Sequence, residues 1–263
     1  METPPITRHH FTATRILALA TAFGATLSAT AEGLYLGVSA SAAFYDVDYS
    51  KAVDSRHADN VSANAGRIFS ASDSADDTTW DAGLVLGYRF GLGALHLDIE
   101  GDVVTHGGEA SARLPGAGAS SGRNQLGEVW PEDWSLAKDR SYGITARLGG
   151  PVPMFGADLS AFVGVRRLDA TFSTSYTGCL LVSGCPPGEF TDGRERHDEE
   201  YDAWVAGIAF EKSLGPVGLR GELRYTDHGN SKRTVRFDDV FVTVPVDLES
   251  GEIGLGVSLI WRP

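Results

Sequence analysis

The sequence has 263 residues, of which 42% are hydrophobic and 22% are charged, which is the composition of a folded protein. Its 35 acidic and 22 basic residues give a net charge of −13, which argues against nucleic acid as a partner. Two cysteines are too few for a disulfide scaffold or a conventional zinc site. The mean hydropathy of −0.10 excludes a bundle of transmembrane helices.

Residues 1–31 predict a cleaved signal peptide. Arg8 and Arg15 give a basic start, and residues 16–27 form an apolar stretch too short to span a bilayer. Residues 29–31 (Ala-Thr-Ala) have the small-x-small pattern of a cleavage site, which places the mature start at Glu32. An uncleaved membrane anchor is the alternative. Residues 32–263 then form one exported domain.

Strict alternation of apolar and polar residues predicts eight β-strands in this domain. The segments are 34–45, 80–90, 94–104, 141–149, 155–168, 201–212, 217–226 and 252–261. One face of each segment is apolar and free of Asp, Glu, Lys and Arg, whereas the other carries glycine, serine and charges of both signs. The main charges of these polar faces are Arg89, Asp98, Glu100, Arg147, Asp158, Arg166, Glu211, Arg220, Glu222, Arg224 and Glu252.

A soluble β-sandwich would show the same alternation, with its apolar faces turned inward. Two features favour instead a transmembrane barrel with apolar faces outward. Opposite charges can pair inside a narrow lumen. In addition, aromatic residues occur at both ends of the apolar faces, as in the two girdles of a membrane barrel. The predicted lower girdle is Tyr88, Phe90, Phe155, Phe210 and Trp261, and the upper one is Phe44, Trp80, Tyr142, Trp204 and Tyr225.

Connection lengths agree with a barrel. Short Gly/Pro turns at 91–93, 149–154 and 213–216 alternate with long connections near 46–79, 105–140, 169–200 and 227–251. Short periplasmic turns and long extracellular loops are typical of outer-membrane barrels. Residues 240–246 alternate again, and we expect them to begin the last strand above the membrane. Two additional strands, making ten, are the competing count.

Several segments carry a family resemblance: 33–38 (GLYLGV), 82–90 (AGLVLGYRF), 144–149 (ITARLG), 222–227 (ELRYTD) and 253–261 (IGLGVSLIW). They resemble small bacterial outer-membrane β-barrels, namely the opacity-protein and porin-like surface antigens and the membrane domain of outer membrane protein A. The resemblance covers the strands of the mature chain and not its long connections.

The resemblance implies an all-β, eight-stranded antiparallel up-and-down barrel in the outer membrane of a Gram-negative bacterium. Its partners would be outer-membrane lipid, lipopolysaccharide and the barrel-assembly machinery, which reads a C-terminal aromatic residue in this family. Here Trp261 is followed by Arg262 and Pro263, which departs from that pattern. The implied role is structural or surface-interacting, with no cofactor, through an outer-loop ligand that the sequence does not identify.

The predicted lumen charges allow two interpretations. An eight-stranded barrel has an interior just wide enough for side chains, so paired arginines and carboxylates are expected to fill it. A narrow pore for small solutes is the alternative.

A surface hydrolase is a second alternative, but we assign no catalytic residue. Asp227 and His228 precede a loop with Asp238 and Asp239, a combination found in outer-membrane proteases, but those proteins have ten strands. His228 and Ser231 lack the spacing that a deacylase nucleophile requires. A hydrated acidic loop is the preferred interpretation.

The predicted outer loops contain two further features. The first is rich in Asp, but its spacing does not match a calcium loop, so no metal site is assigned. Cys179 and Cys185 are expected to form a disulfide after export. The disulfide loop 180–182 (Leu-Leu-Val), with Trp130 and Trp134 of the second loop, predicts exposed apolar spots on a partner surface.

Overall fold

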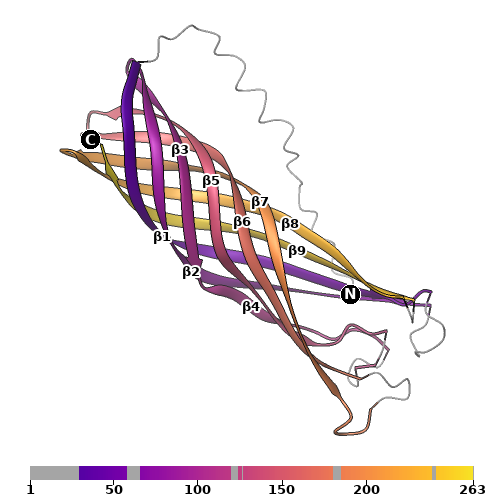
Figure 1. Ribbon diagram of the computed structural model, residues 1–263. Helices are drawn as coiled ribbons and strands as arrows, with labels where there is room; N and C mark the ends of the chain where they lie inside the picture. The colour runs from indigo at the N-terminus through magenta and orange to yellow at the C-terminus, as the bar shows by residue number, and fades with distance from the viewer. Residues whose placement is uncertain are drawn as a thin grey trace, which may run out of the picture.

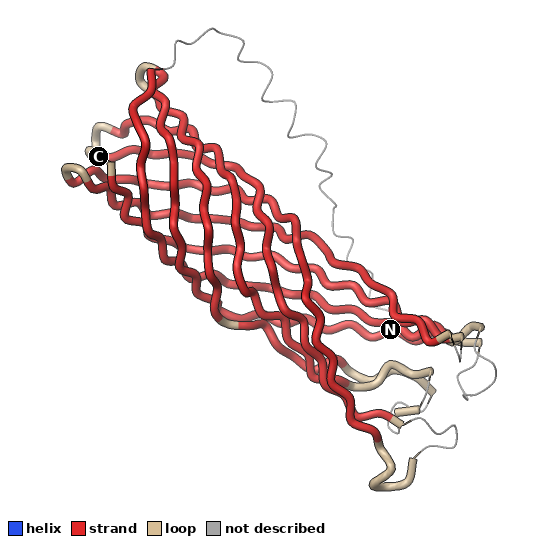
Figure 2. The backbone as a smooth tube through the Cα atoms, in the orientation of Figure 1, coloured by secondary structure: helices blue, strands red, loops and turns tan. Residues whose placement is uncertain are grey.

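The computed structural model describes residues 30–57, 66–119, 124–125, 127–179, 185–238 and 241–262. Most of the predicted signal peptide lies outside these residues, so its cleavage stays a prediction. The described chain is built from antiparallel strands (Figure 2). The strands are β1 (Thr30–Asp54), β2 (Ile68–Leu92), β3 (Leu95–Gly107), β4 (Glu109–Leu114), β5 (Glu132–Val152), β6 (Ala157–Gly178), β7 (Thr191–Leu214), β8 (Val217–Phe237) and β9 (Val242–Trp261).

The strands close into a barrel. They are ordered β3-β2-β1-β9-β8-β7-β6-β5-β4, and an additional ladder between β3 and β5 completes the ring. Gly108, with φ of 100°, separates β3 from β4, and both pair with β5, so the two occupy one place in the wall. The predicted eight-stranded antiparallel barrel is therefore confirmed, and residues 242–246 extend its last strand as expected.

The lower half of the barrel has its apolar face outside. On β1, Leu34, Leu36, Val38 and Phe44 point outward and are about half exposed, whereas Tyr35 points inward and is fully buried. Residues 34–44 span about 25 Å along the barrel axis, at a rise of about 3.3 Å per residue and a strand tilt of about 40°. This height equals that of the apolar band of a transmembrane barrel.

No helix in the described part of the chain is long and apolar enough to cross a membrane.

The strands continue far above this band, so much of what the sequence predicted as long loops is β-structure. β1 runs to Asp54, and β7 begins at Thr191. Odd-numbered residues of β1 still point inward after Phe44, but the polarity of the two faces reverses there. Tyr45 and Tyr49 point inward and are buried, while Asp48 lines the outer surface. Polar residues thus meet water outside, and apolar residues meet each other inside.

Above the membrane the barrel wall opens along two seams. Among the described residues, the β7–β8 ladder begins at Trp204–Asp227 and the β2–β3 ladder at Trp80–Gly107, each running toward the short turns. The strands therefore separate into two groups, β8-β9-β1-β2 and β4-β5-β6-β7 (Figure 1). We call this outer part the head.

The two sheets of the head pack face to face around an apolar core. β1, β2 and β9 contribute from one sheet, and β4, β5, β6 and β7 from the other, together with Val129 of the β4–β5 connection. The buried members are Tyr45, Val47, Tyr49, Val53, Ala75, Ala110, Leu114, Val129, Trp134, Leu136, Leu168, Ala170, Phe172, Tyr201, Val242, Val244, Val246 and Leu248. The chain is therefore a lipid-facing barrel below and a packed two-sheet structure above.

Candidate functional site: a sealed, charged lumen

Arg220 of β8 is the centre of the ion-pair network in the lower lumen. Its side chain is 1% exposed and donates to Glu100 at 2.5 Å and to Glu211 at 3.0 Å. Arg147 of β5 donates to Glu222 at 2.6 Å and to Glu100 at 3.1 Å. The two arginines therefore share Glu100, and between them they bind three carboxylates. Charged side chains from β3, β5, β7 and β8 thus form ion pairs with one another across the interior.

A second group of charges closes the end of the barrel that carries the short turns. Arg89 binds Asp98 through two parallel bonds of 2.7 Å, and its guanidinium lies 3.5 Å from Asp158. Arg262, beyond the last strand, reaches Glu211 at 2.6 Å. The chain end therefore contributes to the lumen, a role that its position after Trp261 gave no reason to expect.

Aromatic rings fill the space between these charges. Tyr35 donates to Glu100 at 2.6 Å and lies across Gly87, where an added Cβ would come within 2.2 Å of its ring. The Arg147 guanidinium lies 4.4 Å from the centre of the Phe162 ring. Glycine on the lumen face is therefore required where a large side chain from the neighbouring strand crosses the barrel.

Higher in the lumen, a chain of polar contacts joins four strands. Asp81 Oδ1 lies 2.6 Å from His106 Nδ1, and His106 Nε2 lies 2.8 Å from Ser141 Oγ. Arg166 donates to the same Ser141 Oγ at 2.6 Å and also pairs with Asp102.

Two more groups complete this level. Lys138 binds Glu252 and lies 3.5 Å from Asp81. Arg224 donates to Glu222 at 3.0 Å. Lys138 and His106 lie in what the sequence predicted as the loop 105–140, which is why the predicted set of lumen charges lacks them.

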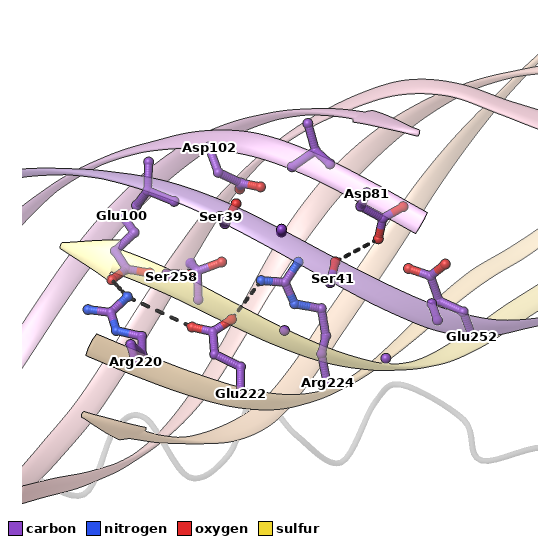
Figure 3. Close-up of a pocket in the computed structure, with 17 residues that line it drawn as sticks. Ser39, Ser41, Asp81, Glu100, Asp102, Arg220, Glu222, Arg224, Glu252 and Ser258 are labelled. Atoms are coloured by element: carbon purple, nitrogen blue, oxygen red, sulfur yellow. Dashed lines mark hydrogen bonds and ion pairs between the residues drawn. The ribbon is translucent and has the colours of Figure 1, made fainter. Parts of the chain in front are cut away.

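Asp81, His106 and Ser141 have the connectivity of a hydrolytic triad, in which a carboxylate orients an imidazole that accepts the serine proton. Their surroundings do not fit nucleophilic chemistry. Ser141 is completely buried, and Arg166 already occupies its oxygen. The adjoining cavity, lined by Ser41, Asp81 and Glu252 among others, has a volume of about 30 Å³ (Figure 3). That is room for about two water molecules and not for an acyl substrate.

The apolar core of the head lies directly above this lumen. The rings of Tyr49, Trp134 and Phe172 meet there, with centroids 5.1 Å apart for Tyr49–Phe172 and 5.3 Å apart for Tyr49–Trp134. The Glu132 carboxylate lies among these rings. Tyr49 donates a hydrogen bond to it, and Lys51 binds it at 2.7 Å. Burial, together with the Glu132 carboxylate, raises the pKa of Tyr49 far above its usual value, so the phenol keeps its proton.

The other predicted residues fall as follows. Eight of the predicted girdle aromatics are 42–60% exposed: Phe44, Trp80, Tyr142, Phe155, Trp204, Phe210, Tyr225 and Trp261. Tyr88 and Phe90 are half-buried against each other, with centroids 4.8 Å apart. The predicted disulfide joins Cys179 to Cys185.

Two predictions about the outer connections need correction. Trp134 is 2% exposed and belongs to the head core, because β5 extends to Glu132, so it is not an apolar knob. Trp130 packs on Tyr176 and donates to the Gln125 carbonyl at 2.8 Å. The third spot, residues 180–182, lies outside the described residues.

Of the residues considered for a surface hydrolase, Asp227 and His228 point to opposite faces of the wall, and Asp239 lies outside the described residues. Asp227 accepts from the Trp204 indole at 3.0 Å on the outer surface. His228, the next residue, is buried in the lumen, 3.9 Å from Glu252, because a bulge at 227–229 shifts the register there. In the described residues, three or more His, Cys, Asp or Glu side chains are nowhere placed to hold a metal ion.

Comparisons with known proteins concern the fold. No protein-family model matches the sequence. No curated protein matches it either. Among solved structures, the chain is similar to the outer membrane protease OmpT of Escherichia coli (8% identity, 90% of this chain and 98% of that chain, TM-score 0.46).

Two further solved structures are similar over most of their length. They are Neisserial surface protein A (15% identity, 87% of this chain and 97% of that chain, TM-score 0.34) and Ail, the attachment invasion locus protein of Yersinia pestis (14% identity, 83% and 98%, TM-score 0.27). At these values the similarity carries no information on activity. The closed ring and the outward apolar band of this chain are by themselves those of an outer-membrane β-barrel.

Proposed function

We propose that this protein is a non-conducting outer-membrane barrel that holds a rigid two-sheet head at the cell surface for contact with a partner. The observation that carries the proposal is the apolar core above the membrane band. Ten residues of β1, from Tyr45 to Asp54, extend past the band, which corresponds to about 25 Å above the membrane. A protein whose work lay in the membrane alone would not need this extension.

The lumen charges serve this role as packing. The eleven predicted lumen charges, from Arg89 to Glu252, form ion pairs with each other or with neighbouring side chains inside the closed ring. Paired charges that take the place of water in a narrow lumen make the barrel stiff. The aromatic girdles set the depth of the barrel at the two lipid–water interfaces. Both functions are mechanical, and neither requires a cofactor.

Two independent seals support a non-conducting barrel over a narrow pore. The first is the layer of Arg147, Arg220 and Glu222 in the lumen, and the second is the head core around Phe172. Ions would have to pass both in series. An outward path through the two seams is covered in part by Arg233 of β8, which binds Glu199 of β7 at 2.7 Å.

Planar-bilayer recording of the refolded full-length protein tests the seal. We expect no steady single-channel steps from the wild-type protein. We expect the same from a variant with both Arg147→Ala and Glu222→Ala, because the head core remains closed. Steady ohmic steps from the wild-type protein would establish the pore alternative instead.

Labelling of intact cells tests the direction of insertion. A cysteine at Asp76, exposed on the head strand β2, should react with a membrane-impermeant maleimide. A cysteine at Ser213, beside the short β7–β8 turn, should react only after the outer membrane is permeabilised. The opposite pattern would place the head in the periplasm and contradict a surface role.

A further inference from the structure

The three short turns of the barrel are apolar, in contrast to the charged outer surface of the head. They connect β2 to β3, β5 to β6 and β7 to β8, and Figure 2 shows them in tan at the end opposite the head. The turns and the residues beside them, 91–95, 151–157 and 213–218, are all described, and they contain no Asp, Glu, Lys or Arg. An apolar surface outside a protein core marks contact with something other than water.

The large side chains at these turns are not folded back onto the barrel. Met154 is 85% exposed, Phe155 and Leu214 are each more than half exposed, and Leu95 is about half exposed. A single exposed apolar side chain is ordinary on a protein surface. Here such side chains come from all three turns, so the feature belongs to this end of the barrel as a whole.

This surface is continuous with the lipid-facing band. Leu214 lies on the same outward face of β7 as Phe210, and Phe155 of the neighbouring turn packs on Phe210 with ring centroids 6.2 Å apart. Lys212 lies between Phe210 and Leu214 on that face and is exposed. Its methylene groups can remain in an apolar layer while its ammonium group extends to the level of lipid phosphates.

The lengths of the strands show how deep the turns lie. Trp204 belongs to the upper aromatic girdle, and Leu214 follows it ten positions later on β7. At a rise of about 3.3 Å per residue and a tilt of about 40°, these positions are about 25 Å apart along the barrel axis, which is the full height of an apolar band. On β5, the same count from Tyr142 leads to Val152, directly before the turn. These turns therefore lie at the edge of the band and not beyond it.

We propose that the short-turn end of the barrel is embedded in the headgroup layer of the inner leaflet and binds phospholipid there, so that it does not project into the periplasmic water. The apolar side chains of the turns pack against the lipid, and Lys212 binds a lipid phosphate. The inference takes only the direction of insertion from the proposed function. It does not depend on whether the barrel conducts or on what the head binds.

Fluorescence quenching tests the inference on the full-length protein in nanodiscs of phosphatidylcholine with a minor fraction of phosphatidylglycerol, where water reaches both faces of the bilayer. Met154→Cys and Leu214→Cys carry a fluorophore on the turns, and Asp76→Cys carries it on the head. The native cysteines are held in their disulfide and do not react. We expect iodide in the water to quench the two turn probes several-fold less than the head probe. A lipid with a nitroxide in its headgroup should quench the turn probes and not the head probe.

Two results of this experiment would overturn the inference. If iodide quenches the probes at 154 and 214 as strongly as the probe at 76, the turns project into water. If the turn probes are shielded from both iodide and the nitroxide lipid, lipid headgroups are not what covers them. Either result would leave the proposed function intact, because sealing of the lumen and labelling of the head do not depend on the depth of the turns.

A pair of matched substitutions gives a second test. Leu214→Asp should lower the equilibrium constant for folding into lipid vesicles about fivefold, because a charge near the edge of the apolar layer is unfavourable. Phe241→Asp changes an apolar residue of the head that is exposed to a similar extent, 54% against 58%, and should leave the constant within about twofold. A heat-shift gel measures the folded fraction of each variant. An unchanged constant for Leu214→Asp, or an equal loss for both variants, would contradict the inference.

Discussion

Replacing Arg220 by methionine tests whether the lumen charges hold the barrel together. Methionine keeps most of the length of the side chain and removes its charge. Arg220 approaches Glu100 at 2.5 Å, Glu211 at 3.0 Å and Glu222 at 3.8 Å. Removing one partner from a buried ion pair costs about 3–5 kcal/mol, because the remaining charge stays in a medium of low dielectric constant.

The surroundings place the expected cost at the lower end of that range. Glu100 keeps Arg147 at 3.1 Å, and Glu211 keeps Arg262 at 2.6 Å. We therefore expect Arg220→Met to lower the free energy of unfolding by about 3 kcal/mol. Urea unfolding in detergent micelles, followed by tryptophan fluorescence and by heat-shift mobility, measures this difference.

Two comparisons make the result decisive. Arg236→Met removes an exposed arginine of the same strand and should change the free energy by less than about 0.5 kcal/mol. Arg220→Met combined with Glu211→Gln should be no more stable than Arg220→Met alone, because Glu211 still pairs with Arg262 after the first substitution. If Arg220→Met unfolds within about 0.5 kcal/mol of the wild-type protein, the network is not what stabilises the lumen.

Three further predictions test the other layers. Leu84→Arg, at the middle of the lipid-facing band, should destabilise the folded protein in lipid by about 2–4 kcal/mol. Leu34→Arg, near the lower edge of the band, should destabilise it by about 1 kcal/mol or less. Equal folded fractions for both variants on a heat-shift gel would contradict the position of the band. Phe172→Ala in the head core should cost about 3–5 kcal/mol in urea unfolding, and Phe237→Ala, which is 47% exposed, about 1 kcal/mol or less; similar losses would argue against a packed head. Exchange of both Cys179 and Cys185 for serine should cost about 2 kcal/mol, as expected for a short disulfide loop, and an unchanged urea midpoint would exclude that contribution.

The lower half of the barrel could be predicted closely because one rule governs it. Lipid excludes charge from every outward position, so residues such as Leu84 and Leu86 alternate without exception with lumen residues. The same rule places Arg89 and Asp98 inside before any pairing is known. Only their partners require the three-dimensional register, since Arg220 and Glu100 are 120 residues apart.

The head could not be predicted in the same way, because its pattern has the opposite meaning. Tyr45, Val47 and Tyr49 alternate with Asp46 and Asp48, and this density of Asp predicts an acidic loop, not a strand. The sequence pattern presents a sandwich and a barrel as alternatives, whereas in the structure the long strands form a barrel in their lower half and a two-sheet packing in their upper half. The inward face stays buried along the whole of β1, but the change of surroundings at Phe44, from lipid to water, reverses which face is apolar. Composition alone does not mark that point.

Local irregularities also shaped the upper lumen. The register shift between Lys138 and Arg140 turns Lys138 inward and leaves Arg140 outside, bound to Asp169 at 2.8 Å. A bulge of this kind interrupts the period of two, so the run from 132 to 142 did not predict a strand. The sequence pattern places Trp134 in a loop for the same reason.

Cysteine scanning along β1 tests the central claim most directly. Single cysteines at successive positions from 34 to 54, each carrying an environment-sensitive fluorophore, are measured in lipid vesicles with and without a quencher confined to the acyl chains. We expect quenching at every even position up to 44, and from 45 onward a water-excluded signal at odd positions that the lipid quencher does not reach. Quenching that continued at even positions beyond 44, or an emission pattern without a change at Phe44, would contradict a barrel that turns from outward-facing to inward-facing apolar surfaces.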